Sequence, residues 1–319
     1  IALVLGNAMI LKPSEKVPLT ALKNAEILHT AGVPKDMFQV INGDREIVEA
    51  ICDHPEISAI SFVGSTKIAE TVYKRASQNL KQVLCLGGAK NYLIVLPDAH
   101  VDMTASNIAA SFTGCAGQRC MAASVLVAVG DCESIISKVK EVSMTITPGK
   151  DLGAIITEES KNRIETLIAN AERDGATVVL DGRNISMEGS YVGPTILDNV
   201  TPEMEISKEE VFGPVLCIMR VDNVEEAVSL QNQCNYGNGA GVFTQSGSLA
   251  AYVSEKLSAG MVGVNIGVPV PREPFSFGGW NASKFGTGDI TGKSSIQFWS
   301  KKKKITTKWN PEDQINWMS

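Results

Sequence analysis

Short apolar runs alternate with helix-like segments along the first 200 residues, and this alternation constrains the fold more than any other feature. Asn7–Lys12, Phe38–Ile41 and Ser58–Ser65 have the composition of short strands. Between them, Pro18–Ala31 spaces its apolar residues at helical intervals, and Thr66–Ser77 follows as a second helix. QVLCL and YLIVL are nearly continuous apolar strands. Such strands, separated by helices, predict a parallel sheet that is covered on both faces.

The pattern continues beyond Gly87–Gly88, where we place a boundary between two α/β layers, and a second boundary lies near Gly292. VPVPREPFSFGGW is rich in Pro and Gly and predicts a loop. After it, IQFWS and KITTKW alternate like exposed, paired strands. The other strands predicted here are SVLVAV, TVVL, VLCIMRV and AGVF, and the helices are Met103–Phe112, Glu158–Asp174, Val224–Gln233 and Ser248–Ala259.

Composition excludes several classes of protein. The net charge of −6 argues against a nucleic-acid-binding protein, and no apolar run is long enough to cross a membrane. The seven cysteines are scattered without a C-x-x-C pair, and the three histidines do not cluster with them, so no metal site is expected. Free thiols fit a reducing compartment, the cytoplasm or, in a eukaryote, the mitochondrial matrix. The apolar start lacks both a signal-peptide pattern and a Met, so we expect a fragment.

The stretch FTGCAGQRCMAAS places Arg119 directly before Cys120 among small residues. One interpretation is a tight buried corner, in which cysteine serves as a small apolar side chain. The other is an activated nucleophile, because a nearby positive charge lowers a thiol pKa and the thiolate is the reactive form. For Cys115 we favour packing, with a regulatory disulfide to Cys120 as the alternative.

Two strand ends offer ligand-binding groups. In LKPSE, Lys12 and Glu15 follow a strand at the carboxyl edge of the predicted sheet, where open α/β folds bind ligands. A carboxylate there can accept hydrogen bonds from a ribose 2′-hydroxyl and would repel a 2′-phosphate. In FVGSTKIAE, Gly64 and Ser65 lead into a helix whose free backbone N–H groups suit a phosphate. Each signal taken alone favours the plainer interpretation, a solvated turn for LKPSE and an ordinary helix cap for FVGSTKIAE.

The motifs LKPSE, FVGS, LGGAKN, GQRC, EEVFGP and NYGNGAGVF occur in this order over nearly the whole chain. Together they resemble the aldehyde dehydrogenase superfamily, and GQRCMA and GAKN are most similar to its methylmalonate- and malonate-semialdehyde branch. The resemblance implies an α/β fold with a parallel Rossmann-type cofactor domain, a catalytic domain and a C-terminal oligomerisation strand. It assigns residues 1–87 to the C-terminal part of the NAD-binding domain, 88–291 to the catalytic domain and 292–319 to a homo-oligomer interface. The family's usual N-terminal part is absent from this sequence.

The same resemblance implies a role for individual positions. Cys120 matches the nucleophile, and its neighbour Arg119 is a candidate for holding a substrate carboxylate, with a structural salt bridge as the alternative. The positions that match cofactor contacts are Lys12 and Glu15 at the adenosine ribose, Gly64 and Ser65 beside the pyrophosphate, Glu210 at the nicotinamide ribose and Phe212 beside the nicotinamide.

One departure from the wider family bears on the reaction. Hydrolytic members carry a glutamate just before LGG, whereas this chain has Cys85, and a thiol is a poor general base at neutral pH. The resemblance therefore implies NAD-dependent oxidation of a (methyl)malonate-type semialdehyde through a cysteine thioester. The acyl group would pass to coenzyme A with decarboxylation, giving propionyl-CoA or acetyl-CoA. Two alternatives stay open: a hydrolytic aldehyde dehydrogenase that releases a free acid, and a non-catalytic fragment or subunit with the same fold.

Overall fold

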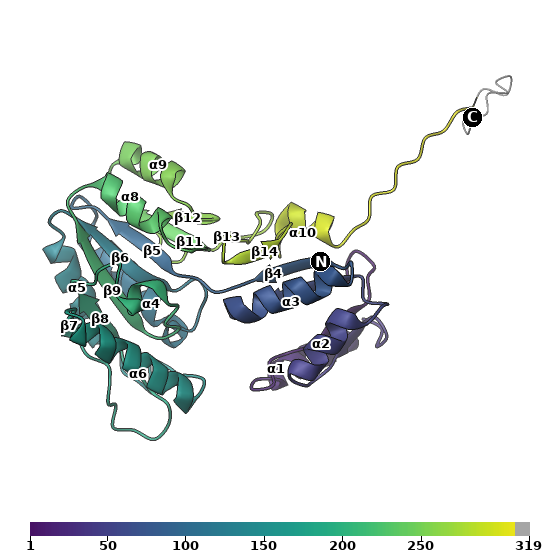
Figure 1. Ribbon diagram of the computed structural model, residues 1–319, viewed down its shortest axis with the longest axis horizontal. Coiled ribbons are helices and arrows are strands. Elements are labelled where there is room, and N and C mark those ends of the chain that lie inside the picture. The colour runs from purple at the N-terminus through teal and green to yellow at the C-terminus, as the bar shows by residue number, and fades with distance from the viewer. Residues whose placement is uncertain (310–319) are drawn as a thin grey trace.

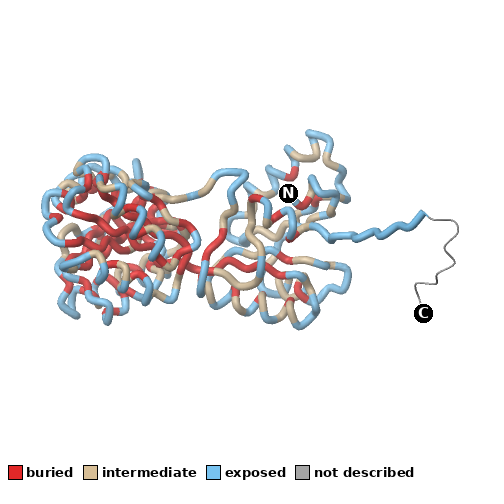
Figure 2. The backbone as a smooth tube through the Cα atoms, turned by 90° about the horizontal axis from the view of Figure 1, so that it is seen from above, coloured by how far each residue is buried: buried red, intermediate tan, exposed pale blue. Residues whose placement is uncertain are grey.

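The computed structural model describes residues 1–309, which form a larger and a smaller lobe with a narrow connection between them (Figures 1 and 2). The larger lobe is built on a seven-stranded sheet with the order β12-β11-β5-β6-β9-β8-β7. All neighbouring strands in it are parallel except β7 and β8. Its strands are β5 (Asn91–Val95), β6 (Ala123–Val129), β7 (Thr177–Leu180), β8 (Thr195–Asp198), β9 (Val215–Val221), β11 (Gly239–Phe243) and β12 (Met261–Val264).

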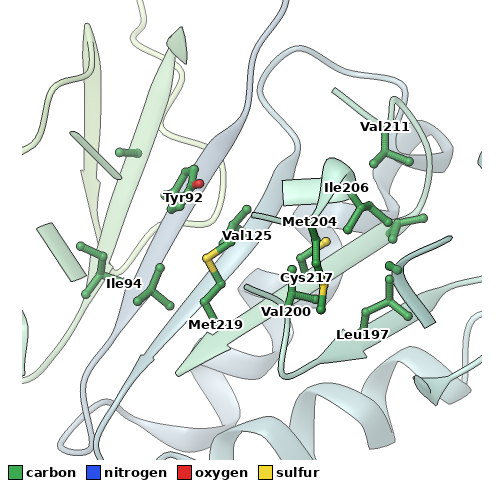
Figure 3. Close-up of a cluster of buried hydrophobic side chains, with 14 of the residues drawn as sticks. Tyr92, Ile94, Val125, Leu197, Val200, Met204, Ile206, Val211, Cys217 and Met219 are labelled. Carbon is green, nitrogen blue, oxygen red and sulfur yellow. The ribbon is translucent and has the colours of Figure 1, made fainter. Parts of the chain in front are cut away.

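Helices cover both faces of this sheet, as the sequence predicted, although the strands expected in one parallel sheet divide among three sheets. On one face, Leu93 and Val95 pack with α4 (Val101–Thr113) and α5 (Glu133–Met144). The alternate residues of the strands, such as Tyr92, Val125 and Met219 in Figure 3, face the opposite way. That second face is covered by α6 (Glu158–Arg173), α8 (Val224–Asn232) and α9 (Gly247–Lys256). The continuous apolar character of β5 and β6 follows, since neither of their faces contacts water.

The smaller lobe contains a three-stranded sheet with the order β14-β4-β3, in which β14 is antiparallel to β4. A separate parallel pair, β1 and β2, lies at the start of the chain. The elements of this lobe are β1 (Met9–Leu11), α1 (Leu19–Thr30), β2 (Phe38–Val40), α2 (Arg45–Asp53), β3 (Ala59–Val63), α3 (Thr66–Gln78), β4 (Gln82–Leu86), β14 (Lys284–Gly286) and α10 (Gly292–Phe298). Short elements elsewhere are the 3-10 turn η1 (Gly114–Gly117), α7 (Glu205–Lys208), β10 (Tyr236–Gly237) and β13 (Trp280–Asn281).

The C-terminal region corrects one prediction. IQFWS was expected to be a strand, but Ile296–Phe298 end helix α10, where Ser295 and Phe298 are buried three residues apart on one face. The apolar alternation therefore arose from a short helix. Lys304–Trp309 is exposed and has no strand in the single chain, so its pairing with another subunit stays a prediction. Residues 310–319 of the predicted oligomerisation segment lie outside the described residues. Within residues 1–309, no helix combines the length and apolar character that a membrane span requires.

The connection between the lobes places two sheet edges against each other. Strand β4 ends at Leu86, and β5 begins at Asn91 after only the sequence GGAK. The carboxyl edge of the β3–β4 sheet therefore meets the amino edge of the seven-stranded sheet. Segments that immediately precede β6, β9 and β11 end at this same amino edge, because these strands run parallel to β5.

Candidate active site

The segment before Cys120 makes an unusual left-handed turn. Cys115, Ala116 and Gly117 have φ values of 54°, 54° and 68°. At Gly117 the turn lies against the carbonyl of Gly213, and a Cβ atom would collide with that backbone. Side chains cost free energy in this backbone region, and such strain is typical of functional sites. The turn brings the Cys120 segment, which precedes β6, into contact with the segment that precedes β9.

Cys120 lies in a small pocket at this junction and is half-buried. Three other residues predicted from the sequence line the same pocket: Arg119, Glu210 and Phe212. Phe212 lies in the loop before β9, is exposed and has a φ of 52°, in the left-handed region. The rest of the lining comes from Ala89, Asn91, Gly117, Ala122, Ala123, Ser124, Val211, Gly213 and Val215.

Glu210 is held against the connection between the two lobes. Its Oε1 accepts a hydrogen bond from the Ala89 N–H at 3.1 Å. A Cβ atom on Gly88 would lie 2.6 Å from its Oε2, so only glycine fits there without displacing the carboxylate. Burial raises the pKa of Glu210 to about 7, although the Ala89 hydrogen bond and the charge of Lys90 oppose this shift. The carboxyl group can therefore change charge near neutral pH.

Two cations from other elements hold the loop that carries Glu210. Lys90 is 2% exposed, and its Nζ donates to the carbonyls of Ile206 at 2.7 Å and Glu209 at 2.9 Å. Burial lowers the pKa of this amine. From α6, Arg163 Nη2 donates to the Val211 carbonyl at 2.6 Å. These backbone contacts hold the loop by its carbonyls and leave the Glu210 side chain facing the pocket.

Arg119 does not act on Cys120 as the sequence suggested. Its Nη2 donates to the carbonyls of Ala110 at 3.0 Å and Ser111 at 2.8 Å, near the C-terminus of α4. A cation is favourable there because the carbonyl ends of a helix carry partial negative charge. Burial and the Glu210 carboxylate raise the pKa of Cys120. The prediction that Arg119 lowers the pKa of Cys120 is therefore wrong, because the guanidinium contacts α4 and the pKa of the thiol is raised. Within residues 1–309 Arg119 forms no salt bridge, and its buried Nε has no hydrogen-bond partner.

Gly64 and Ser65 lie next to the pocket, at the junction of β3 and α3. Ser65 is the exposed N-cap of α3, and its side chain makes no capping hydrogen bond. The following residue, Thr66, accepts the Gly88 N–H on its Oγ1 at 2.8 Å. Gly88 also contacts Glu210, so this glycine lies in space between the start of α3 and the Glu210 carboxylate.

Lys12 and Glu15 lie apart from this group. They follow β1, and Nζ of Lys12 is 3.4 Å from Oε2 of Glu15. Hydrogen bonds from its own backbone and from Lys12 lower the pKa of the exposed Glu15. Neither residue lines the Cys120 pocket, and β1–β2 forms no hydrogen bonds with the β3–β4 sheet within the described chain.

Four polar residues at the site were not assigned a role from the sequence: Lys90, Asn91, Arg163 and Asn238. Three of them lie in the quoted motifs LGGAKN and NYGNGAGVF, which were the available signal. Asn91 and Asn238 donate to the Cys120 carbonyl. Arg163 lies on an amphipathic helix in no motif, and nothing in its local sequence distinguishes it from a solvent-exposed arginine.

Glu210→Gln is expected to stabilise the protein at pH 8 and to change its stability little at pH 5. The folded chain binds the Glu210 proton up to about pH 7, whereas the ordinary pKa is 4.5. The anion is therefore penalised only in the folded state, and the penalty is absent below pH 4.5, grows with pH and is complete above pH 7. It amounts to about 2–3 kcal/mol. Urea unfolding of both proteins at the two pH values measures it, and an equal difference at both would contradict the buried carboxylate.

Known proteins share the sequence pattern and the fold of this chain. The sequence matches the aldehyde dehydrogenase family over residues 1–305. It is 44% identical over 320 residues to the malonate-semialdehyde dehydrogenase of Bacillus subtilis strain 168, covering 98% of this chain and 66% of that protein. The malonate-semialdehyde dehydrogenase of Halalkalibacterium halodurans is 43% identical over 318 residues, covering 97% and 66%. The chain thus spans slightly less than two thirds of the length of these curated relatives.

Two crystal structures have the same fold. A protein assigned as a methylmalonate-semialdehyde dehydrogenase from Sinorhizobium meliloti 1021, complexed with NAD, has a TM-score of 0.95 and 42% identity, covering 97% of this chain and 65% of that chain. The methylmalonate-semialdehyde dehydrogenase of Oceanimonas doudoroffii has a TM-score of 0.94 and 42% identity, covering 97% and 66%. The family match, the sequence identities and the shared fold confirm the resemblance seen in the motifs, and the chain belongs to the aldehyde dehydrogenase family.

Proposed function

We propose that this chain forms the larger part of an NAD-dependent semialdehyde dehydrogenase in which Cys120 is the nucleophile and coenzyme A accepts the acyl group. The observation that carries the proposal is the convergence of Cys120, Glu210 and Phe212 on one pocket at the amino edge of the seven-stranded sheet. The names and the NAD complex of the related proteins support it.

The chemistry requires a covalent step at Cys120. The thiolate adds to the aldehyde carbon, so that a C–S bond forms and the carbonyl oxygen becomes an oxyanion. The oxyanion lets the hydride leave, and the product on Cys120 is a thioester. NAD, when bound, supplies the hydride acceptor. The backbone N–H of Cys120 is our candidate donor to the oxyanion.

The cofactor contacts proposed here are those that the family resemblance implies. Glu210 would hold the nicotinamide ribose, and Phe212 would lie beside the nicotinamide. The uncapped start of α3 at Gly64 and Ser65 leaves backbone N–H groups available to a pyrophosphate. Lys12 and Glu15 would hold the adenosine ribose, and the lowered pKa of Glu15 keeps an anion there that would repel the 2′-phosphate of NADP.

Two observations support the acyl acceptor and the substrate class. Cys85 is fully buried with Cys52, Ala69 and Val72, and burial raises its pKa to about 12, so it cannot serve as a general base. This favours transfer of the acyl group to a thiol over hydrolysis. Arg119 lines the pocket and stays our candidate for binding a substrate carboxylate, as a malonate-type semialdehyde provides, once its guanidinium leaves the carbonyls of Ala110 and Ser111. Loss of that carboxylate as CO₂ from the thioester would give acetyl-CoA or propionyl-CoA.

One observation favours a second function. Glu210, with its pKa of about 7, lies in the Cys120 pocket and could activate water, which would make the enzyme hydrolytic and its product a free acid. The third possibility, a non-catalytic chain with this fold, would show no reduction of NAD at all. We further propose a homo-oligomer in a reducing compartment, with Lys304–Trp309 pairing between copies.

Coenzyme A is expected to accelerate turnover by about a hundredfold or more, because a CoA thiolate attacks a thioester without the general base that water needs. The assay combines the longest natural chain that contains residues 1–319 with NAD and malonate semialdehyde, with and without coenzyme A, and identifies the products by mass. Acetyl-CoA as the main product supports the proposal. Equal rates with free acid as the product would support the hydrolytic alternative.

A further inference from the structure

Two side-chain amides converge on the backbone carbonyl of Cys120. Nδ2 of Asn91 donates to this oxygen at 2.7 Å, and Nδ2 of Asn238 donates to it at 3.0 Å. The two residues come from the start of β5 and the residue before β11, which are neighbouring strands. Asn91 is 4% exposed and Asn238 is 6% exposed, so both amides are removed from solvent. Both lone pairs of the Cys120 carbonyl oxygen are thus occupied.

The surrounding hydrogen bonds determine how the Asn91 amide is oriented. Its Oδ1 accepts the Gly239 N–H at 3.0 Å, which requires oxygen on that side. Its nitrogen must then face the carbonyls, where it donates to Cys120 and, at 2.8 Å, to Ala122. Asn91 therefore links β11 to the nucleophile segment with three hydrogen bonds.

Anchoring the carbonyl also aims a backbone donor. In a planar trans peptide, the C=O of Cys120 and the N–H of Met121 point in opposite directions. With the oxygen held by the two amides, the Met121 N–H faces the other side, toward the thiol. Hydrogen bonds from Asn238 and from the backbone N–H groups of Cys120 and Met121 lower the pKa of the thiol, opposing the effects of burial and Glu210.

The Asn238 amide also has an N–H that can donate a hydrogen bond to Sγ of Cys120. Besides the Cys120 carbonyl, its Nδ2 contacts Sδ of Met121 at 3.1 Å. A thioether is a weak acceptor, and a thiolate is a much stronger one because it is charged. A negative charge on Cys120 can therefore attract this N–H without displacing a strong hydrogen bond.

We propose that Asn238 is a catalytic residue whose amide donates a hydrogen bond to the negatively charged Sγ of Cys120. Asn91 is a positioning residue: it holds the Cys120–Met121 peptide so that the Met121 N–H points at the same sulfur atom. The inference rests on the proposed role of Cys120 as nucleophile. It adds two side chains of the LGGAKN and NYGNGAGVF motifs to the nucleophile's environment.

The test measures the reactivity of Cys120 without substrate or cofactor. Residues 1–319 are alkylated with iodoacetamide over a range of pH, digested with trypsin and quantified by mass. Cleavage after Arg119 separates Cys120 from the exposed Cys115. The Cys120 peptide runs to Lys138 and also contains the buried Cys132, so fragment-ion masses identify which of the two thiols is alkylated. Asn238→Ala is expected to slow alkylation of Cys120 about three- to tenfold at pH 7 and to move its midpoint to higher pH.

Two further variants separate a specific effect from general destabilisation. Asn238→Asp has nearly the same shape but replaces the donor with an anion, so it should shift the midpoint further than Asn238→Ala. Asn265→Ala is the matched control, because Asn265 also bridges backbone groups, at Thr244, and is absent from the pocket lining. It should leave the rate and midpoint of Cys120 unchanged even where it lowers the melting temperature.

An unchanged midpoint and rate in folded Asn238→Ala or Asn238→Asp would overturn the assignment of Asn238. Asn91→Ala should slow Cys120 alkylation as well, with part of the effect explained by lost stability. Because iodoacetamide is the only probe, the result does not depend on NAD or an aldehyde. A chain without dehydrogenase activity but with the expected alkylation profile would refute the proposed function and retain this inference.

Discussion

Cys120→Ala is expected to abolish aldehyde-dependent formation of NADH, with a loss of about 10⁴-fold or more in kcat/KM. Without the thiol, no covalent adduct forms and the aldehyde has no oxyanion from which hydride can leave. Because Cys120 is only half-buried, the substitution should change the free energy of unfolding by about 1 kcal/mol or less. NADH absorbance with malonate semialdehyde measures the loss, in residues 1–319 and in the longest natural chain that contains them.

Cys115→Ala is the matched control for this prediction. Cys115 lies five residues earlier in the same segment, is exposed and shares its positive φ with Ala116, so alanine fits its backbone. The control should retain most of the activity. If Cys120→Ala stayed active while Cys115→Ala did not, the nucleophile would have to be reassigned to Cys115.

Cys85→Glu is expected to destabilise the folded chain by about 4–5 kcal/mol at pH 8, because a carboxylate would be buried among apolar side chains. The Cys85 side chain packs between the β3–β4 sheet and helices α2 and α3, with Cys52 and Val72. The folded-state pKa of the new carboxyl group would be raised above its unfolded value. Its destabilising effect should therefore be smallest below about pH 4, grow as pH rises above the unfolded pKa, and stay constant above the folded pKa.

Cys85→Gln isolates the charge in this experiment. It has the same size as glutamate and does not titrate, so its unfolding free energy in urea should show no corresponding change between pH 5 and pH 8. A Cys85→Glu protein as stable as Cys85→Gln at pH 8, with faster release of free acid, would mean that the new carboxylate turns toward Cys120. That result would restore the expectation, drawn from the family pattern, that a glutamate at this position promotes hydrolysis.

Much of the fold could be predicted from local sequence. The apolar runs at β4, β5 and β9 and the amphipathic pattern of α6 lie within two residues of the observed elements, because a strand covered on both faces must be apolar throughout. Several elements were missed, among them α5, β8, β12 and β14, although α5 has apolar residues at helical spacing in Ile135, Ile136 and Val139. Strand β14 has only Lys284–Gly286, and its pairing with β4 is a long-range contact that three residues do not encode. Helix α10, Gly292–Phe298, is also short, and its few apolar residues match a strand pattern as well as a helical one.

The sequence by itself determined the family and the positions of Cys120 and Glu210 within its motifs, because each motif is a short run of residues and their order can be read without knowing the fold. Only the tertiary structure decided where the charges point. Arg119 is adjacent to Cys120 in sequence, yet its guanidinium contacts the end of α4, while Glu210 and Asn238, distant in sequence, lie near the thiol. The reason is that β4 continues into β5 across only the sequence GGAK. This short connection sets the carboxyl edge of one sheet against the amino edge of the next, and side chains from several strand ends meet where the two edges face each other.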